Sequence, residues 1–82
     1  MKIGDLEYRF TRGSDVVRDG MFLEADVVGA AERRTVAEVF YSDATGKFSV
    51  TLFEESVPAE LVEFLIADAK ACLPPTHGDA DG

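Results

Sequence analysis

The stretch that most constrains the fold is residues 35–74, where two strand-like segments are followed at once by a helical one. Residues 47–53 alternate strictly between apolar and polar side chains, which is typical of a strand buried on one face. The apolar members of this segment are Phe48, Val50 and Leu52. Residues 35–42 are rich in β-branched and aromatic side chains and also favour a strand. Together the two segments predict a β-hairpin.

The turn between these strands, residues 42–47, predicts how they pair. Gly46 can adopt the positive φ that a tight turn requires. The run YSDATGKFSVT resembles the C-terminal hairpin of the B1-type domains of streptococcal protein G, where the same Tyr-x-Asp-Ala-Thr-x-x-Phe spacing closes a four-residue loop. Gly46 stands where that family has a lysine. The resemblance implies a turn geometry and a register, and it implies nothing about immunoglobulin binding.

This register resolves an ambiguity, because both faces of residues 35–42 carry apolar side chains. The resemblance implies that Tyr41 faces Phe48 and that Val39 faces Val50. The inner face is then expected to comprise Ala37, Val39, Tyr41, Phe48, Val50 and Leu52. The outer face is expected to pair Val36 with Phe53, Glu38 with Thr51, and Phe40 with Ser49.

A helix is expected directly after the hairpin. Ser56 is a favourable N-cap, Pro58 is tolerated in the first turn, and Pro74 ends the helix after Leu73. At about 100° per residue, one apolar stripe should pack on the inner face of the sheet. Its members are Leu61, Val62, Leu65, Ile66, Ala69, Cys72 and Leu73. Phe64 falls off this stripe.

Two more strands are predicted in the first part of the chain, over residues 6–11 and 21–28, because apolar residues alternate in both. The second has one face with Met21, Leu23, Ala25 and Val27, and another with Phe22, Glu24, Asp26 and Val28. Residues 12–20 contain turn signals. Val16 and Val17 between them fit either a short strand or a cover for the edge of the core.

The fold class predicted from these segments is α+β. We expect a four-stranded antiparallel meander sheet with one C-terminal helix packed on one face, in the order ββββα. Residues 1–73 should form a single domain, and residues 74–82, rich in Pro, Gly and Asp, a disordered tail. One helix covers only part of such a sheet, so the other face is either solvated or used in a contact.

The charge of the chain restricts its partners. The 82 residues carry 16 acidic and 8 basic side chains, for a net charge of −8. Such a surface repels phosphates, which argues against nucleic acid bound directly through phosphates and against an anionic membrane. It suits a basic protein partner, or solubility alone. The chain has a single cysteine, and it has neither a signal-like nor a membrane-spanning apolar run. These features favour the cytoplasm.

No catalytic, cofactor or metal site is expected, and we predict no enzymatic activity. Glycines are scattered singly, and Cys72 and His77 are the only residues of their types, so neither a phosphate loop nor a zinc set is present. Glu24, Asp26 and Glu38 could share a proton or bind a cation. Exposed acids on a strand are more often simply solvated.

The outer face carries more large apolar side chains than a solvated sheet needs, and a mixed aromatic and acidic patch is typical of a protein contact. A loop that covers the rings, or scattering of the rings across the sheet, would explain them equally well, and Phe64 could pack against a sheet edge. The candidate contact residues are Phe22, Glu24, Asp26, Val36, Glu38, Phe40, Phe53 and Phe64.

Two functions fit these features. The first is a small acidic cytoplasmic interaction module that binds a basic protein through the outer face. It is similar in size and charge to an immunity protein of a bacterial toxin system or to a phage-encoded inhibitor. The alternative is a structural homodimer formed through a sheet face or an edge strand.

Overall fold

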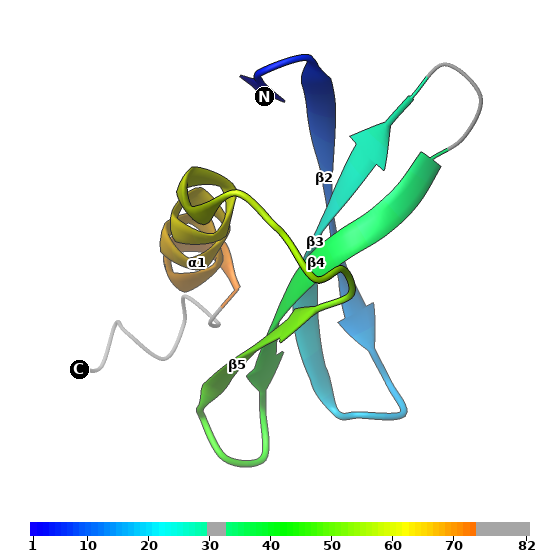
Figure 1. Cartoon of the computed structure of the whole chain (residues 1–82). Coiled ribbons are helices and arrows are strands. Elements are labelled where there is room, and N and C mark those ends of the chain that lie inside the picture. Colours follow the sequence, from blue (N-terminus) through cyan, green and yellow to red (C-terminus); the bar gives the residue numbers. More distant parts are fainter. Residues whose placement is uncertain (30–32, 74–82) are drawn as a thin grey trace.

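The computed structural model describes residues 1–29 and 33–73, which form one antiparallel sheet and one helix (Figure 1). The elements are β1 (Lys2–Ile3), β2 (Leu6–Asp15), β3 (Gly20–Val28), β4 (Arg33–Ser42), β5 (Phe48–Leu52) and α1 (Ala59–Cys72). The sheet has the order β1-β2-β3-β4-β5. The predicted α+β class and the meander with one C-terminal helix are confirmed. The tail expected over residues 74–82 lies outside the described residues.

The short strand β1 is an addition to the predicted fold. A two-residue loop of Gly4 and Asp5 joins it to β2, and Gly4 has a φ of 61°, which glycine adopts at little cost. Met1 continues the pairing, because its carbonyl accepts from the Tyr8 N–H at 2.7 Å and its amino group donates to the Tyr8 carbonyl at 2.9 Å. The N-terminus thereby lies along one edge of the sheet.

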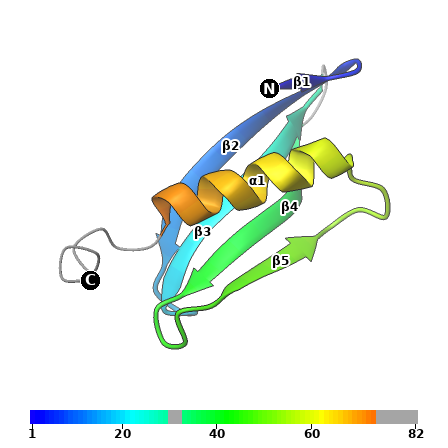
Figure 2. The same ribbon diagram turned by 90° about the vertical axis from the view of Figure 1, so that its left-hand side faces the viewer.

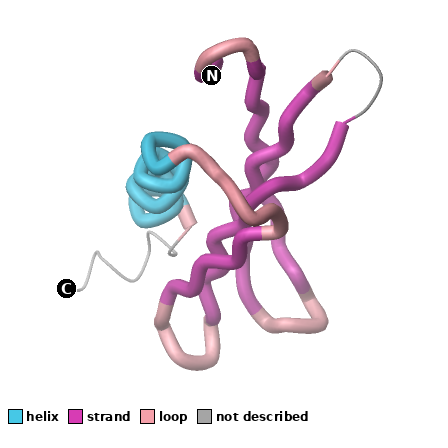
Figure 3. The backbone as a smooth tube through the Cα atoms, in the orientation of Figure 1, coloured by secondary structure: helices cyan, strands magenta, loops and turns pink. Residues whose placement is uncertain are grey.

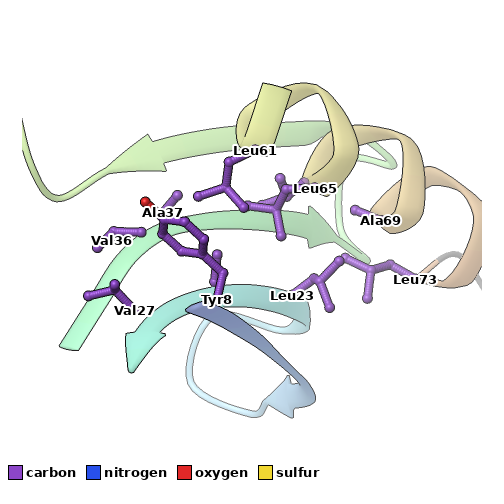
Figure 4. Packing of buried hydrophobic residues seen from close by; sticks show 11 residues of the cluster. Tyr8, Leu23, Val27, Val36, Ala37, Leu61, Leu65, Ala69 and Leu73 are labelled. Atoms are coloured by element: carbon purple, nitrogen blue, oxygen red, sulfur yellow. The ribbon is translucent and has the colours of Figure 1, made fainter. Parts of the chain in front are cut away.

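The helix α1 lies across one face of the sheet, chiefly over β3 and β4, as Figures 2 and 3 show from two directions. Figure 4 shows the core between these layers. Its buried residues are Tyr8, Leu23, Ala25, Val27, Val36, Ala37, Val39, Leu61, Leu65, Ala69 and Leu73. The central members of the predicted helix stripe are among them, so the apolar face of the helix was correctly assigned.

The helix begins later than the sequence suggested. Ser56 is not its N-cap; Pro58 holds that position, and its carbonyl accepts from the N–H groups of Leu61 at 3.1 Å and Val62 at 3.2 Å. Within residues 1–29 and 33–73, no side chain caps this end. At the other end the Leu73 N–H donates to the Ala69 carbonyl at 2.8 Å.

The predicted register of the β4–β5 hairpin is confirmed. Val39 pairs with Val50, and Tyr41 pairs with Phe48, with their ring centroids 5.1 Å apart. In the turn, the Gly46 N–H donates to the Ser42 carbonyl at 2.8 Å, and Gly46 has a φ of 71°. The turn therefore has the left-handed residue at the position that its sequence indicated.

The strands differ from the prediction in their lengths and at one bulge. β2 continues to Asp15, so Val16 and Val17 lie almost fully exposed at the tip of the turn and form neither a strand nor a cover. Ala25 pairs with Ala37 but Asp26 pairs with Thr35, which leaves Val36 as an extra residue on β4.

The placement of Val36 on the outer face was therefore wrong. The bulge interrupts the alternation of side chains along β4, and Val36 is buried in the core together with Ala37. Strict period-two alternation holds only where each residue of one strand faces one residue of the next.

The backbone at Gly46 gives a first prediction. Gly46→Val should lower the free energy of unfolding by roughly 1–2 kcal/mol, because a β-branched residue resists positive φ. Space is not the obstacle, since a Cβ there would approach only the Tyr41 hydroxyl, at 3.9 Å. Gly46→Asn should cost clearly less, because asparagine tolerates this region. Equal losses for both variants in urea denaturation would contradict the role assigned to the positive φ of Gly46.

Candidate functional site

The sheet face opposite α1 brings most of the predicted contact residues together in rows that cross the strands. One row consists of Gly13, Phe22, Phe40 and Ser49, on β2 to β5 in that order. The next row consists of Thr11, Glu24, Glu38 and Thr51. Beyond it, Asp26 lies opposite Arg9 on one side and Thr35 on the other. An aromatic row thus lies beside an acidic one, as the alternation predicted.

The two aromatic rings of this face rest on glycines of the same sheet. A Cβ on Gly13 would lie 2.7 Å from Cζ of Phe22, and a Cβ on Gly20 would lie 2.4 Å from Cζ of Phe40. Each ring therefore occupies space that a side chain would otherwise fill, which is how aromatic residues compensate for glycine in a strand. Both rings are partly buried within this single chain.

Arg18, in the turn between β2 and β3, reaches over this face. Its guanidinium donates two hydrogen bonds to Glu38, of 3.0 and 2.8 Å, and its Nε donates to Asp15. The guanidinium carbon also lies 4.2 Å from the centroid of the Phe40 ring. Hydrogen bonds to Glu38 and Asp15 raise the pKa of Arg18, so it remains a cation throughout. One side chain therefore covers a ring and neutralises a carboxylate that is only 6% exposed.

Asp26, 7% exposed, is compensated in a similar way. It accepts from Arg33 Nε at 3.1 Å and from the Thr35 hydroxyl at 2.7 Å. Two of the three predicted acids of the outer face are therefore occupied by partners within the chain. They contribute to the structure of the sheet, because a buried carboxylate without partners would be strongly destabilising.

Glu24 differs from the other two acids, because it lies directly opposite Glu38 and has Asp26 on the same face of its own strand. Burial, and then the negative charges of Asp26 and Glu38, raise the pKa of Glu24, while Arg18 partly opposes this shift. The described residues contain no group of three or more metal-binding side chains and no pocket.

The remaining predicted residues lie apart from this cluster. Val36 is in the core, and Phe64 packs its ring against Phe10 of β2 with centroids 5.1 Å apart, so much of its surface is used within the chain. Phe53, 55% exposed, follows β5 directly. Of the eight candidates, it has the most exposed ring.

A second surface is not predicted from the sequence, because the alternation places its residues in the core. Val50 and Leu52 of β5 are on the helix side of the sheet but are 43% and 49% exposed, since α1 packs over β3 and β4. Figure 2 shows β5 beside the area that the helix covers, with its outer edge open. We name Phe48–Leu52 together with Phe53 the β5 edge. It contains no charged residue.

The backbone of the β5 edge also has groups that point away from β4 and have no partner among the described residues. The Lys47 carbonyl accepts from Ser42 at 3.0 Å, and the Phe53 N–H donates to Val36 at 2.8 Å, so both groups point toward β4. Because antiparallel pairing alternates, the N–H and C=O groups of the residues between them alternate in direction too. Those that point away from β4, toward the open edge, belong to Phe48, Val50 and Leu52.

The opposite edge of the sheet is different. Tyr8 of β2 points its N–H and C=O toward Met1, so by the same alternation Phe10, Arg12 and Ser14 face outward there. Along this edge β2 carries charged side chains, including Arg9 and Arg12, which discourage the addition of another strand. In the part of the chain that the structure describes, only the β5 edge combines outward backbone groups with an uncharged, apolar sequence.

No family model, curated protein or solved structure matches this chain. Within the described ranges, no helix has both the length and the apolar character needed to cross a bilayer.

The environment of Glu24 gives a second prediction. Its folded-state pKa is raised, so protonation of Glu24 favours the folded chain at acid pH, and this advantage is lost as the pH rises through the folded-state pKa. Glu24→Gln should therefore raise the free energy of unfolding at pH 7, by roughly 0.2–1 kcal/mol, because it removes like charges that face each other across two strands.

The control for this prediction is Glu55→Gln, which changes the net charge equally at an exposed position. Urea denaturation across the acid range should show the gain of Glu24→Gln shrinking as the pH falls below the Glu24 pKa. A gain that is the same at every pH, or the same in both variants, would contradict the role assigned to Glu24.

Proposed function

We propose that this protein is a small interaction module that binds another polypeptide by adding its strand to the β5 edge. The observation that carries this proposal is the coincidence, on one strand, of outward N–H and C=O groups with the exposed side chains of Val50, Leu52 and Phe53. In this mode of recognition the backbone bonds supply affinity, and alternate side chains supply specificity.

The outer face of the sheet, with its acidic row, is a weaker candidate for the binding site than the β5 edge. Glu38 and Asp26 are already bound by Arg18 and Arg33. Exchanging these arginines for basic side chains of another protein would add little binding free energy. Phe22 and Phe40 likewise rest on glycines of their own sheet. Binding of a basic partner through this face stays a prediction from charge, and the β5 edge has the better geometry.

The chemistry of the β5 edge defines what it would bind. Phe48, Val50 and Leu52 present apolar side chains on the helix side, and Ser49 and Thr51 present hydroxyls on the other. A matching strand would alternate apolar and small polar residues and would carry no charge opposite the centre of β5. Unpaired edges that lack charged residues are also the ones that associate most readily.

A third prediction tests this site through the single backbone group that a proline removes. Val50→Pro deletes an outward N–H and leaves the ladder to β4 intact, whereas Ser14→Pro deletes an outward N–H on the opposite edge. In affinity capture with the full chain, polypeptides retained by the parent protein and by Ser14→Pro should be lost from Val50→Pro. Mass spectrometry identifies them.

Circular dichroism must first show that both proline variants are folded. If Val50→Pro is not, Val50→Lys, which adds a charge at the same outward position, replaces it. Capture that is insensitive to the substitution at Val50 would overturn the assignment of the site to the β5 edge.

A further inference from the structure

We propose that the strand that binds the β5 edge is β5 of a second copy of this chain, paired antiparallel about a two-fold axis at Val50. This inference rests on the proposed function and names the partner for the same site. Such a contact is closed and self-complementary, as the interfaces of two-fold symmetric dimers are.

The outward backbone groups of β5 fit this register. When Val50 faces Val50 of the second copy, Phe48 faces Leu52 and Leu52 faces Phe48. These are the three residues whose N–H and C=O groups point to the open edge, so each of these groups finds a partner. A shift of two residues in either direction would leave Phe48 or Leu52 of each copy unpaired.

The side chains agree with this pairing. A two-fold axis perpendicular to the sheet keeps the helix side of both copies on the same side. Val50 then packs on Val50, and Leu52 on Phe48, which covers the apolar side chains that α1 leaves exposed. On the other face, Ser49 lies opposite Thr51. No charge meets a like charge within the paired strands.

The charges that flank β5 also favour the antiparallel orientation of the second copy. Lys47 lies before the strand, and Glu54 and Glu55 follow Phe53. Antiparallel pairing brings Lys47 of one copy beside the Phe53 ring of the other, where a cation–π contact is available. Glu54 is bound by Arg34 of its own chain, so the exposed Glu55 supplies most of the charge attraction to Lys47. A parallel pair would instead set Lys47 against Lys47 and acids against acids.

The register can be tested with two single-cysteine chains, Ser49→Cys and Thr51→Cys, each in a Cys72→Ala background. In the proposed dimer, residues 49 and 51 of different copies form a non-hydrogen-bonded pair with Cα atoms roughly 4.5 Å apart. That separation allows a disulfide, which needs about 4.4–6.8 Å. Residue 49 is roughly 7–8 Å from its own equivalent, beyond that range.

Air oxidation of an equal mixture should therefore give the mixed disulfide dimer, while either chain alone should stay mostly uncrosslinked. Ser49→Cys that crosslinks fully with itself would indicate a parallel pair or another register and would overturn the proposal. The absence of a mixed disulfide, together with sedimentation of the parent chain as a monomer, would overturn it as well.

Sedimentation equilibrium over a concentration series separates this inference from the proposed function. Val50→Pro should raise the dimer dissociation constant at least roughly tenfold, and Ser14→Pro should leave it unchanged. Lys47→Glu should also weaken the dimer more than Lys2→Glu, which changes the net charge equally on the far edge. A parent chain that is monomeric but captures a different protein through Val50 overturns the dimer and leaves the proposed function standing. A monomeric chain whose capture is insensitive to Val50 overturns both.

Discussion

The packing of one helix on two strands is the contact on which the rest of this structure depends. Leu61, Leu65 and Ala69 of α1 are completely buried against β3 and β4. A helix is about 10–12 Å wide with its side chains, whereas neighbouring strands lie about 4.8 Å apart, so one helix covers roughly two strands. In a sheet of this size, both the outer face and β5 then remain without a second layer.

On the outer face, residues of the sheet itself and of one of its turns take the place of a second layer. Gly13 and Gly20 leave room for the rings of Phe22 and Phe40, and Arg18 closes over the second ring while it binds Glu38. Arg33 and Thr35 bind Asp26 in the same way, so a sheet with one helix retains two buried carboxylates. The described residues contain no buried side-chain polar atom that lacks a partner. A face that the sequence presents as a partner site is thus largely completed within the chain.

The elements that could be predicted from the sequence are those governed by neighbouring residues. The β4–β5 hairpin follows from its turn, where Gly46 provides the positive φ, and the helix stripe follows from its period. The bulge at Val36 could not be predicted, because it depends on how β4 meets β3 and has no marker in the sequence.

The cover provided by Arg18 was missed for a related reason, since Arg18 and Glu38 are twenty positions apart and meet only once the sheet is formed. The exposure of Val50 and Leu52 depends on the width of the helix and not on the pattern of the strand, which is the same for a covered and an uncovered strand. The contact face was therefore predicted from alternation, while its internal partners and the second surface were not.

Charged residues are distributed unevenly along the chain, and they are nearly absent from the open β5 edge. Sixteen acidic residues give this protein a surface that repels most non-specific contacts, yet residues 44–53 contain a single charged side chain, Lys47. On the opposite edge, Arg12 of β2 lies in the row that Val50 occupies on β5, and Arg9 adds a second charge. An uncharged β-branched and aromatic segment at a sheet edge is a risk of uncontrolled association unless a defined strand covers it. A symmetric pairing about Val50 would satisfy its backbone groups and bury its side chains in one step, and because a two-fold contact uses the same edge of both copies, no third copy could add there.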